Sequence, residues 1–295
     1  MAKHMRRLLL AGLAFCLSAF SAGAATLDTI GERGSLRIGY ISDEAPFSSS
    51  KPGAEPVGYA IDLCDRIADE IEHQLPQLKR EYVEMTLAHG FDAVKNEEID
   101  LLCGSITVNL DRRETVDFSQ PIFLTGASAL LRKDSPNYLQ TLFLDGPVVH
   151  TVGGRAPTAP TNVIGMRANT TTAAALREAL AIQVSKTKLA DFNTHEDGLK
   201  ALEDHKIDAY IADQVLLISL AKRARDPSSL DVGDRLLTHE PYAIALRRDD
   251  ADFRLLADRA LTDLYLSDDF MPLLEKYFGA EAAMLHTQII MQHVP

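Results

Sequence analysis

The segment from Ser105 to Ser119, SITVNLDRRETVDFS, holds residue types suited to binding a small carboxylate. Two hydroxyl side chains, Ser105 and Thr107, precede the adjacent arginines Arg112 and Arg113. A guanidinium group is planar, stays charged, and can donate two parallel hydrogen bonds to one carboxylate. Because the whole chain has a formal net charge of −12, an arginine pair beside hydroxyl groups indicates a local anion-binding function.

A repeated unit supplies a candidate acid. The stretches AVKNEEIDLLCGS and ALEDHKIDAYIAD both place Ile-Asp before a predicted strand, at Asp100 and Asp208. Five residues after each Asp, a polar residue ends the strand: Ser105 in the first unit and Asp213 in the second. Ligands of doubly wound sheets bind beyond the carboxyl ends of the strands, so two facing units would present these residues to one ligand. The alternative is chance similarity between two helix–strand segments.

The elements that must hold these residues follow a βαβ order. A strand, a helix and a second strand are predicted in the first half, and a strand followed by a helix in the second. These elements are residues 35–41, 58–75, 79–85, 162–166 and 169–181. Alternation of strands and helices predicts parallel sheets. The pattern of helices and strands becomes weaker between residues 134 and 162, where a stretch rich in Gly, Pro and Thr predicts a surface loop.

The amino-terminal residues 1–25 have the pattern of a secretory signal. A basic start is followed by an apolar run and small residues. The run is short for a membrane anchor, which needs ~20 apolar residues. Removing this segment deletes three basic and no acidic residues and changes the formal charge from −12 to −15. Such a charge argues against nucleic acid or anionic lipid as a partner, and no later segment is apolar enough to span a bilayer.

Length and cysteine content bound the architecture further. The remaining ~270 residues predict two lobes. Cys64 lies on the apolar side of the predicted helix 58–75, and Cys103 ends a strand that this helix could cover. In an oxidising compartment the two could form a disulfide, and the alternative is two buried free thiols. The nine histidines are scattered without metal-ligand spacing, so no metal site is predicted.

The chain resembles the periplasmic polar amino-acid-binding proteins, which are the family-3 solute-binding proteins of ABC importers. The resemblance is carried by LRIGYISDEAPFS, GYAIDLCDRIADEI, the long stretch from Phe91 to Phe123, NTTTAAALREAL, KIDAYIAD and LLEKYFG. It implies an α/β fold of two doubly wound lobes, joined by two hinge strands, that close over one amino acid. Lobe one would comprise residues 26–121 and 243–295, lobe two residues 127–237, and the hinges residues 122–126 and 238–242.

The resemblance also implies roles for residues of lobe one. Arg112 matches the family arginine that pairs with the ligand α-carboxylate, whereas Arg113 is expected to face solvent or pair with an acid. Ser105 and Thr107 match positions that contact the charged head group, and Phe91 matches an aromatic residue over the ligand's aliphatic part. The alternatives are that Phe91 is an ordinary core residue, and that Arg112 only forms a salt bridge with Asp111 or Asp117.

In lobe two, Thr171 matches a residue at the start of a helix, where free N–H groups favour a carboxylate. An ordinary helix cap is the alternative. Asn169 stands where many relatives have Gly. Asp213 matches the acid that receives the α-ammonium, and Asp208 is expected to be a structural turn acid.

Selectivity for the ligand side chain is less defined. Glu44 falls near a position where binders of basic amino acids in this family often carry an aromatic residue. An acid there could attract a cation or repel a dicarboxylate, but we expect an exposed loop glutamate.

The implied function is capture of a polar amino acid or similar zwitterion in the periplasm and delivery to the membrane permease of an ABC importer. We expect a monomer without cofactor. Two other functions use the same fold: a periplasmic cyclohexadienyl dehydratase, which turnover of prephenate or arogenate would identify, and a ligand sensor acting in trans. The sequence has no pattern typical of a catalytic nucleophile or a phosphate loop, which favours a binding protein.

Overall fold

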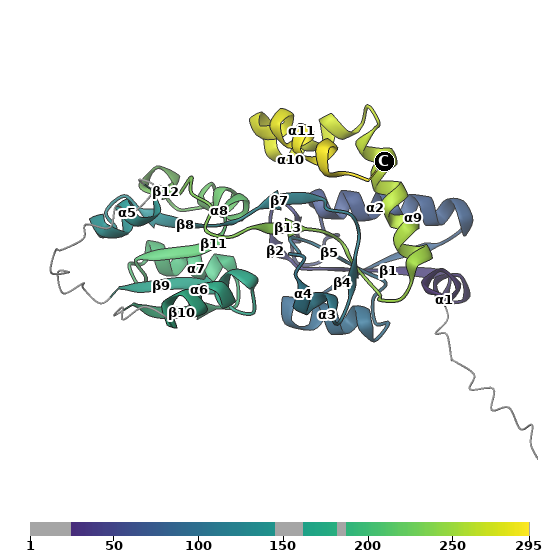
Figure 1. Ribbon diagram of the computed structural model, residues 1–295, viewed down its shortest axis with the longest axis horizontal. Helices are drawn as coiled ribbons and strands as arrows, with labels where there is room; N and C mark the ends of the chain where they lie inside the picture. The colour runs from purple at the N-terminus through teal and green to yellow at the C-terminus, as the bar shows by residue number, and fades with distance from the viewer. Residues whose placement is uncertain (1–24, 145–161, 182–186, 295) are drawn as a thin grey trace, which may run out of the picture.

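The computed structural model describes residues 25–144, 162–181 and 187–294, which form two α/β lobes (Figure 1). The predicted signal segment, except Ala25, and the Gly/Pro-rich stretch 145–161 lie outside the described residues.

Lobe one is built on a five-stranded sheet with strand order β4-β1-β5-β14-β6. Its strands are β1 (Ser35–Tyr40), β4 (Lys79–Glu84), β5 (Leu101–Cys103), β6 (Asp117–Phe118) and β14 (Ala245–Leu246), and a separate small hairpin comprises β2 (Asp43–Glu44) and β3 (Ser48–Ser49). As predicted, β1 lies parallel to both β4 and β5. The carboxyl ends of these parallel strands therefore share one edge of the sheet.

Helices cover both faces of this sheet. They are α1 (Thr26–Arg33), α2 (Tyr59–Gln74), α3 (Leu87–Lys95), α4 (Leu110–Arg113), α9 (Ala251–Tyr265), α10 (Phe270–Phe278) and α11 (Ala282–Gln292), with a 3₁₀ turn at Gly279–Glu281. The predicted apolar stripe of α2, including Ile61, Ile67 and Ile71, is fully buried. Helix α2 packs beside α9, and α10 and α11 lie on its outer side (Figure 1).

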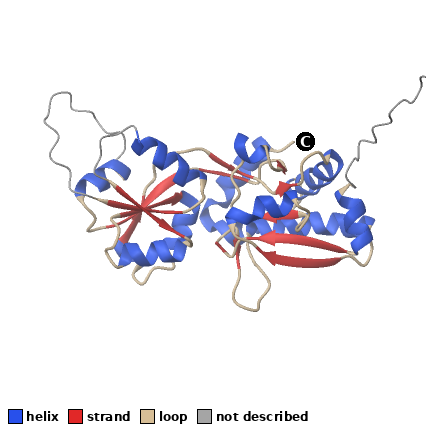
Figure 2. Ribbon diagram, turned by 90° about the horizontal axis from the view of Figure 1, so that it is seen from below, coloured by secondary structure: helices blue, strands red, loops and turns tan. Residues whose placement is uncertain are grey.

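Lobe two has a second five-stranded sheet, with order β10-β9-β11-β8-β12. Its strands are β8 (Ala127–Arg132), β9 (Val163–Arg167), β10 (Lys188–Phe192), β11 (Ala209–Asp213) and β12 (Leu230–Val232). Its helices are α5 (Asn137–Phe143), α6 (Thr171–Ala181), α7 (His195–Glu203) and α8 (Gln214–Ala221), with a 3₁₀ turn at Pro227–Ser229. Figure 2 shows these helices on both sides of the twisted sheet.

The prediction that regular structure weakens from residue 134 onward was partly wrong, because helix α5 forms within this region. Leu139 and Phe143 of α5 are buried against lobe two. The two residues are four apart, which places them on one helix face. The sequence did not indicate this helix, because its apolar face is short and turn-forming residues surround it.

Two strands run between the lobes: β7 (Phe123–Thr125) and β13 (Glu240–Tyr242). They pair antiparallel, with Phe123 opposite Tyr242 and Thr125 opposite Glu240 (Figure 1). Beside them, a Cβ atom on Gly126 would lie 2.2 Å from the carbonyl oxygen of Thr238, so only glycine allows this close backbone approach.

Neither sheet is purely parallel, which the βαβ pattern did not predict. Strand β14 lies antiparallel to β5 and β6, and β8 lies antiparallel to β11 and β12. Both follow directly from the strands that run between the lobes. Strands β8 and β14 therefore enter their sheets from the cleft side. Strands that follow a crossover helix run in the opposite direction, toward the cleft.

The sequence repeat has a matching structural role in each lobe. Asp100 exchanges two hydrogen bonds with the backbone of Arg37: its N–H donates to the carbonyl (2.9 Å) and its carboxylate accepts from the N–H (2.8 Å). Asp208 does the same with Val163, at 2.8 Å for each bond. Both acids therefore hold a helix–strand turn against the neighbouring strand, as expected for Asp208.

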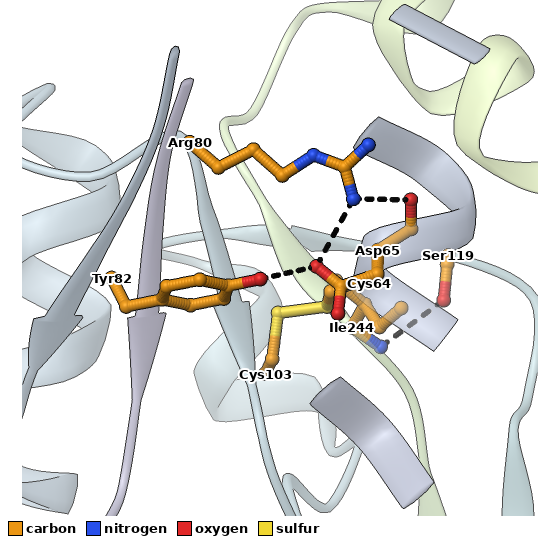
Figure 3. Close-up of a disulfide and its surroundings, with 7 residues drawn as sticks. All are labelled: Cys64, Asp65, Arg80, Tyr82, Cys103, Ser119 and Ile244. Carbon is orange, nitrogen blue, oxygen red and sulfur yellow. Dashed lines mark hydrogen bonds and ion pairs between the residues drawn. A yellow bond between two sulfur atoms is a disulfide. The ribbon is translucent and has the colours of Figure 1, made fainter. Parts of the chain in front are cut away.

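Cys64 and Cys103 form a disulfide that ties α2 to the end of β5 (Figure 3). The structure thus decides between the two alternatives that the sequence left open. Next to Cys64, the carboxylate of Asp65 accepts a hydrogen bond from the Tyr82 hydroxyl (2.6 Å) and approaches the Arg80 guanidinium (3.5 Å). The helix is therefore fastened to both β4 and β5, immediately before the chain enters the cleft at Ser105.

Candidate functional site

A cleft lies between the lobes, at the carboxyl ends of β5, β9 and β11. Six of the seven predicted ligand-binding positions line it together with residues of the lobe-two helices, and the lining comprises Glu44, Leu87, Ser105, Thr107, Arg112, Arg167, Thr170, Thr171, Thr172, His195, Ile211, Ala212, Asp213 and Leu216. Of the seven predicted positions, Phe91 is the one absent from the lining. This is the place where a doubly wound sheet binds its ligands.

Arg112 reaches the cleft from the short helix α4. Asn109 caps this helix, its side-chain oxygen accepting from the Arg112 N–H at 2.7 Å. The guanidinium donates to the carbonyl of Thr107 (2.6 Å) and stacks over the ring of Phe91, 4.7 Å from its centroid. Burial lowers the pKa of Arg112, and the charges of nearby carboxylates, Glu240 first, oppose that shift. These contacts fix the Arg112 guanidinium and leave N–H donors that can bind a ligand.

The surroundings of Arg112 agree only in part with what the sequence predicts. Phe91 does not line the cleft: it packs on the lobe-one core and supports the guanidinium from behind. Arg113 is exposed, as expected. Asp117 binds Arg254 at 2.8 Å, so the alternative in which Asp117 is the partner of Arg112 is wrong.

Asp213 is the last residue of β11 in lobe two and lines the same cleft as Arg112. Its carboxylate accepts hydrogen bonds from the Thr172 hydroxyl (2.9 Å) and from the Tyr242 hydroxyl. Burial, and then the negative charge of Glu240, raises the pKa of Asp213 to about 6. A buried acid whose bonds come only from neutral hydroxyl groups is suited to receiving a cation, because the cation would offset the cost of burying its charge.

Thr171 is the first residue of α6, as predicted, but it is not the cap. Thr170 has that role, since its hydroxyl accepts from the Ala173 N–H at 3.0 Å. The Thr171 hydroxyl donates to Glu240 at 2.7 Å. Asn169 adopts a φ of 61°, a left-handed conformation that Asn tolerates better than most residues, so it can stand in place of Gly.

The expectation of an exposed Glu44 was wrong. Only 2% of Glu44 is exposed, and its carboxylate bridges the lobes. One oxygen accepts from the guanidinium of Arg167 in lobe two (2.9 Å), and the other accepts from the Ser105 N–H (2.9 Å). A Cβ atom on Gly104 would lie 2.8 Å from this carboxylate, so glycine makes room for it. The partner of Glu44 is distant in sequence, which is why a local pattern suggested an exposed loop.

Sequence reasoning missed Arg167, Thr172 and His195 of the cleft lining, and also Glu240, which contacts the lining residue Thr171. Arg167 directly follows the predicted strand 162–166, and Glu240 lies inside the predicted hinge 238–242, so position alone could have drawn attention to both. For His195, whose backbone N–H donates to Asp43 of lobe one at 2.5 Å, no sequence signal was available. Burial, followed by the charges of Arg167 and Arg223, lowers the pKa of His195 to about 3, which keeps its ring neutral.

The described residues contain no cluster of His, Cys, Asp and Glu side chains that could hold a metal ion. Within the same ranges, no helix is long and apolar enough to cross a membrane.

Two lobes, two connecting strands and a charged cleft between them define a solute-binding protein. A family model of the bacterial extracellular solute-binding proteins, family 3, matches residues 36–280. The chain belongs to this family.

Curated relatives agree with that assignment. The chain is 30% identical over 257 residues to the L-glutamate/L-aspartate-binding protein of Pseudomonas aeruginosa, covering 86% of this chain and 80% of that protein. It is 26% identical to the glutamate/aspartate import solute-binding protein of Escherichia coli, with 91% and 84% covered.

Among solved structures, the chain is similar to the ancestral amino acid-binding protein AncCDT-1, described as a precursor of cyclohexadienyl dehydratase. The TM-score is 0.70 at 25% identity, with 86% of this chain and 100% of that chain covered. The P235GK mutant of ArgBP from T. maritima has the same fold, with a TM-score of 0.68 at 23% identity over 86% of this chain and 99% of that chain.

Proposed function

We propose that the chain captures a polar amino acid or similar small zwitterion by closing its two lobes, and delivers it to the membrane permease of an ABC importer. The observation that carries this proposal is that Arg112 of lobe one and Asp213 of lobe two line the same cleft. A zwitterion has one group for each, so it would be bound best when both lobes are engaged. Closure would then be favoured by differential affinity for the closed state.

The ligand carboxylate would be bound by the Arg112 guanidinium, with the hydroxyl of Thr107 beside it. A buried carboxylate without a partner is costly, and the guanidinium is preorganised by Phe91 and the Thr107 carbonyl to meet it. The N–H of Ser105 is already bonded to Glu44, so the side chain of Ser105 is its remaining group for the ligand.

The ligand ammonium would be bound by Asp213. Glu240, which is held by Thr171, adds negative charge to the same region. An ammonium there would stabilise both carboxylates, and the start of α6 would contribute through the orientation of Thr171 and Thr172 toward these acids.

For the closing motion, we propose lobe boundaries at residues 26–121 with 243–295, and 127–237. The segments 122–126 and 238–242 would act as hinges, and they contain the paired strands β7 and β13. Pairing of the two strands would make them bend together, which is consistent with a single closing movement.

We also propose that the protein acts in the periplasm as a monomer and is not an enzyme. Curated relatives are binding proteins, which supports this function. Likeness to a precursor of cyclohexadienyl dehydratase keeps an elimination reaction as the alternative. Incubation with prephenate or arogenate separates the two, since a binding protein leaves these compounds unchanged.

A thermal-shift screen of the exported chain against the common amino acids tests the proposed function. A ligand that binds only the folded state stabilises it by RT ln(1 + [L]/Kd), which is about 2.7 kcal/mol at 100 times Kd. We expect at least one amino acid to raise the melting temperature in a saturable way. No shift with any of them would contradict the proposal.

A further inference from the structure

The ion pair between Glu44 and Arg167 crosses the cleft from one lobe to the other. The two groups come from β2 and from the end of β9, and they are 2.9 Å apart. Both are buried, with 2% and 7% of each residue exposed. Since Glu44 also accepts from the Ser105 N–H, its carboxylate is satisfied at both oxygens and fixed beside the ligand-binding region.

The charges around the cleft are unequal. The carboxylates of Glu44 and Asp213 line the cleft, and that of Glu240 lies beside it, bonded to Thr171. These three acids accompany two lining guanidinium groups, those of Arg112 and Arg167. A zwitterionic ligand adds one charge of each sign and leaves the acidic excess unchanged. A side-chain carboxylate on the ligand would increase that excess, whereas a neutral or cationic side chain would not.

A ligand with a side-chain carboxylate would also lack a partner. Among the described cleft residues, the two arginines are the permanent cations, and Arg112 is assigned to the α-carboxylate. Arg167 is paired with Glu44. Binding a second ligand carboxylate would therefore place it near Glu44 or require the buried pair to separate, and either is unfavourable.

We infer that the cleft selects amino acids whose side chain carries no negative charge, and that Glu44 determines this by occupying Arg167. The inference rests on the proposed function and concerns the ligand class of the same site. It differs from the ligands in the names of the Pseudomonas aeruginosa and Escherichia coli relatives, which are glutamate and aspartate.

Isothermal titration of the wild-type protein with each of the twenty common amino acids tests the inference without any substitution. We expect glutamine and asparagine to bind at least about tenfold more tightly than glutamate and aspartate, since like charges placed together are disfavoured. Glutamate or aspartate as the tightest ligand would overturn the inference and leave the proposed function intact. Absence of binding by all twenty would instead refute the proposed function, and the inference with it.

The variant Glu44→Gln tests the residue assigned. It keeps the shape of the side chain and releases Arg167, so the affinity ratio of glutamate to glutamine should rise by at least about tenfold. Asp191→Asn is the matched control: it removes one acid from an exposed pair with Arg177, outside the cleft lining. An unchanged ratio in Glu44→Gln, or an equal change in Asp191→Asn, would overturn the assignment of Glu44. Should Glu44→Gln fail to fold, the wild-type titrations still decide the ligand class.

Discussion

The hydroxyl of Tyr242, on the connecting strand β13, donates a hydrogen bond to the carboxylate of Asp213 at the end of β11. Tyr242 also forms a β-bridge with Thr107 of lobe one. One residue of the connecting strand therefore contacts cleft residues from both lobes. This arrangement links the position of the strand to the ionisation of the acid that we assign to the ligand ammonium.

Replacing Tyr242 with Phe should weaken ligand binding while keeping the fold. The ring remains in its aromatic cluster with Phe47 and Phe123, but the donor to Asp213 is lost. Hydrogen bonds to charged groups contribute about 1.5–3 kcal/mol, so we expect roughly ten- to hundredfold weaker affinity by titration calorimetry. Tyr59→Phe is the control, because its hydroxyl bonds the carbonyl of Ile122 (3.0 Å) instead. Equal losses in both variants would contradict a role specific to Asp213.

Ligand affinity should decrease as the pH falls below about 6. The pKa of Asp213 is raised to about 6 in the unliganded protein, and a bound ammonium would lower it again. Below pH 6 the ligand must therefore displace a proton, which reduces the apparent affinity. Titrations at pH 5 in two buffers of different ionisation enthalpy should reveal proton release, which disappears at pH 7.5. Affinity that stays constant from pH 4.5 to 7.5 would argue against Asp213 as the ammonium site.

The raised pKa of Asp213 also affects stability without ligand, with a definite sign. The unfolded state loses this proton near its ordinary pKa of 3.8 and the folded state only near 6. The stabilising contribution is therefore complete below pH 3.8 and is lost as the pH rises to about 6. The lowered pKa of His195 has the opposite effect on the pH dependence of stability.

Replacing His195 with Asn should make the protein less sensitive to acid. Since burial lowers the pKa of His195 to about 3, the unfolded state takes up a proton below its ordinary value of 6.5 while the folded state does not. Stability from this group is present above pH 6.5 and is lost as the pH falls toward 3. Urea unfolding at pH 7 and pH 4.5 should show a smaller difference in the variant. His89→Gln, at an exposed histidine, should behave as the wild type.

Removing the disulfide should lower stability by about 2–4 kcal/mol. Cys64 and Cys103 are separated by 39 residues, and the chain-entropy relation gives about 4 kcal/mol for a loop of that length. The double variant Cys64→Ala/Cys103→Ala, unfolded in urea, measures the loss. Wild-type protein kept in a reducing agent should match it. No difference between oxidised and reduced protein would show that the bond does not stabilise the fold.

Much of this structure follows from local patterns in the sequence. The strand at 35–41, the helix at 58–75 and the helix start at Thr171 appear close to where periodicity and turn residues predict them. Arg112 and Asp213 were singled out from the sequence, Arg112 in the segment 105–119 and Asp213 at the end of the repeated unit, and both line the cleft.

Pairs formed across the cleft could not be predicted in the same way. Glu44 and Arg167 are 123 residues apart, and their contact depends on how two separately folded sheets face each other. Likewise, the antiparallel direction of β8 and β14 depends on the path of the connecting strands and not on the composition of β8 or β14. Local patterns specify elements, whereas these features depend on tertiary arrangement.

The most direct measurement of the central claim is a paired titration of Arg112→Met and Arg113→Met with the amino acid found in the screen. Methionine keeps the approximate length of arginine and removes its charge. We predict a loss of about 2–5 kcal/mol for Arg112→Met, roughly 30- to several-thousand-fold in affinity, since the ligand carboxylate loses its partner in the cleft. Arg113 is exposed, so Arg113→Met should lose far less. Equal losses, or a larger loss in Arg113→Met, would contradict the assignment of Arg112 as the carboxylate-binding residue.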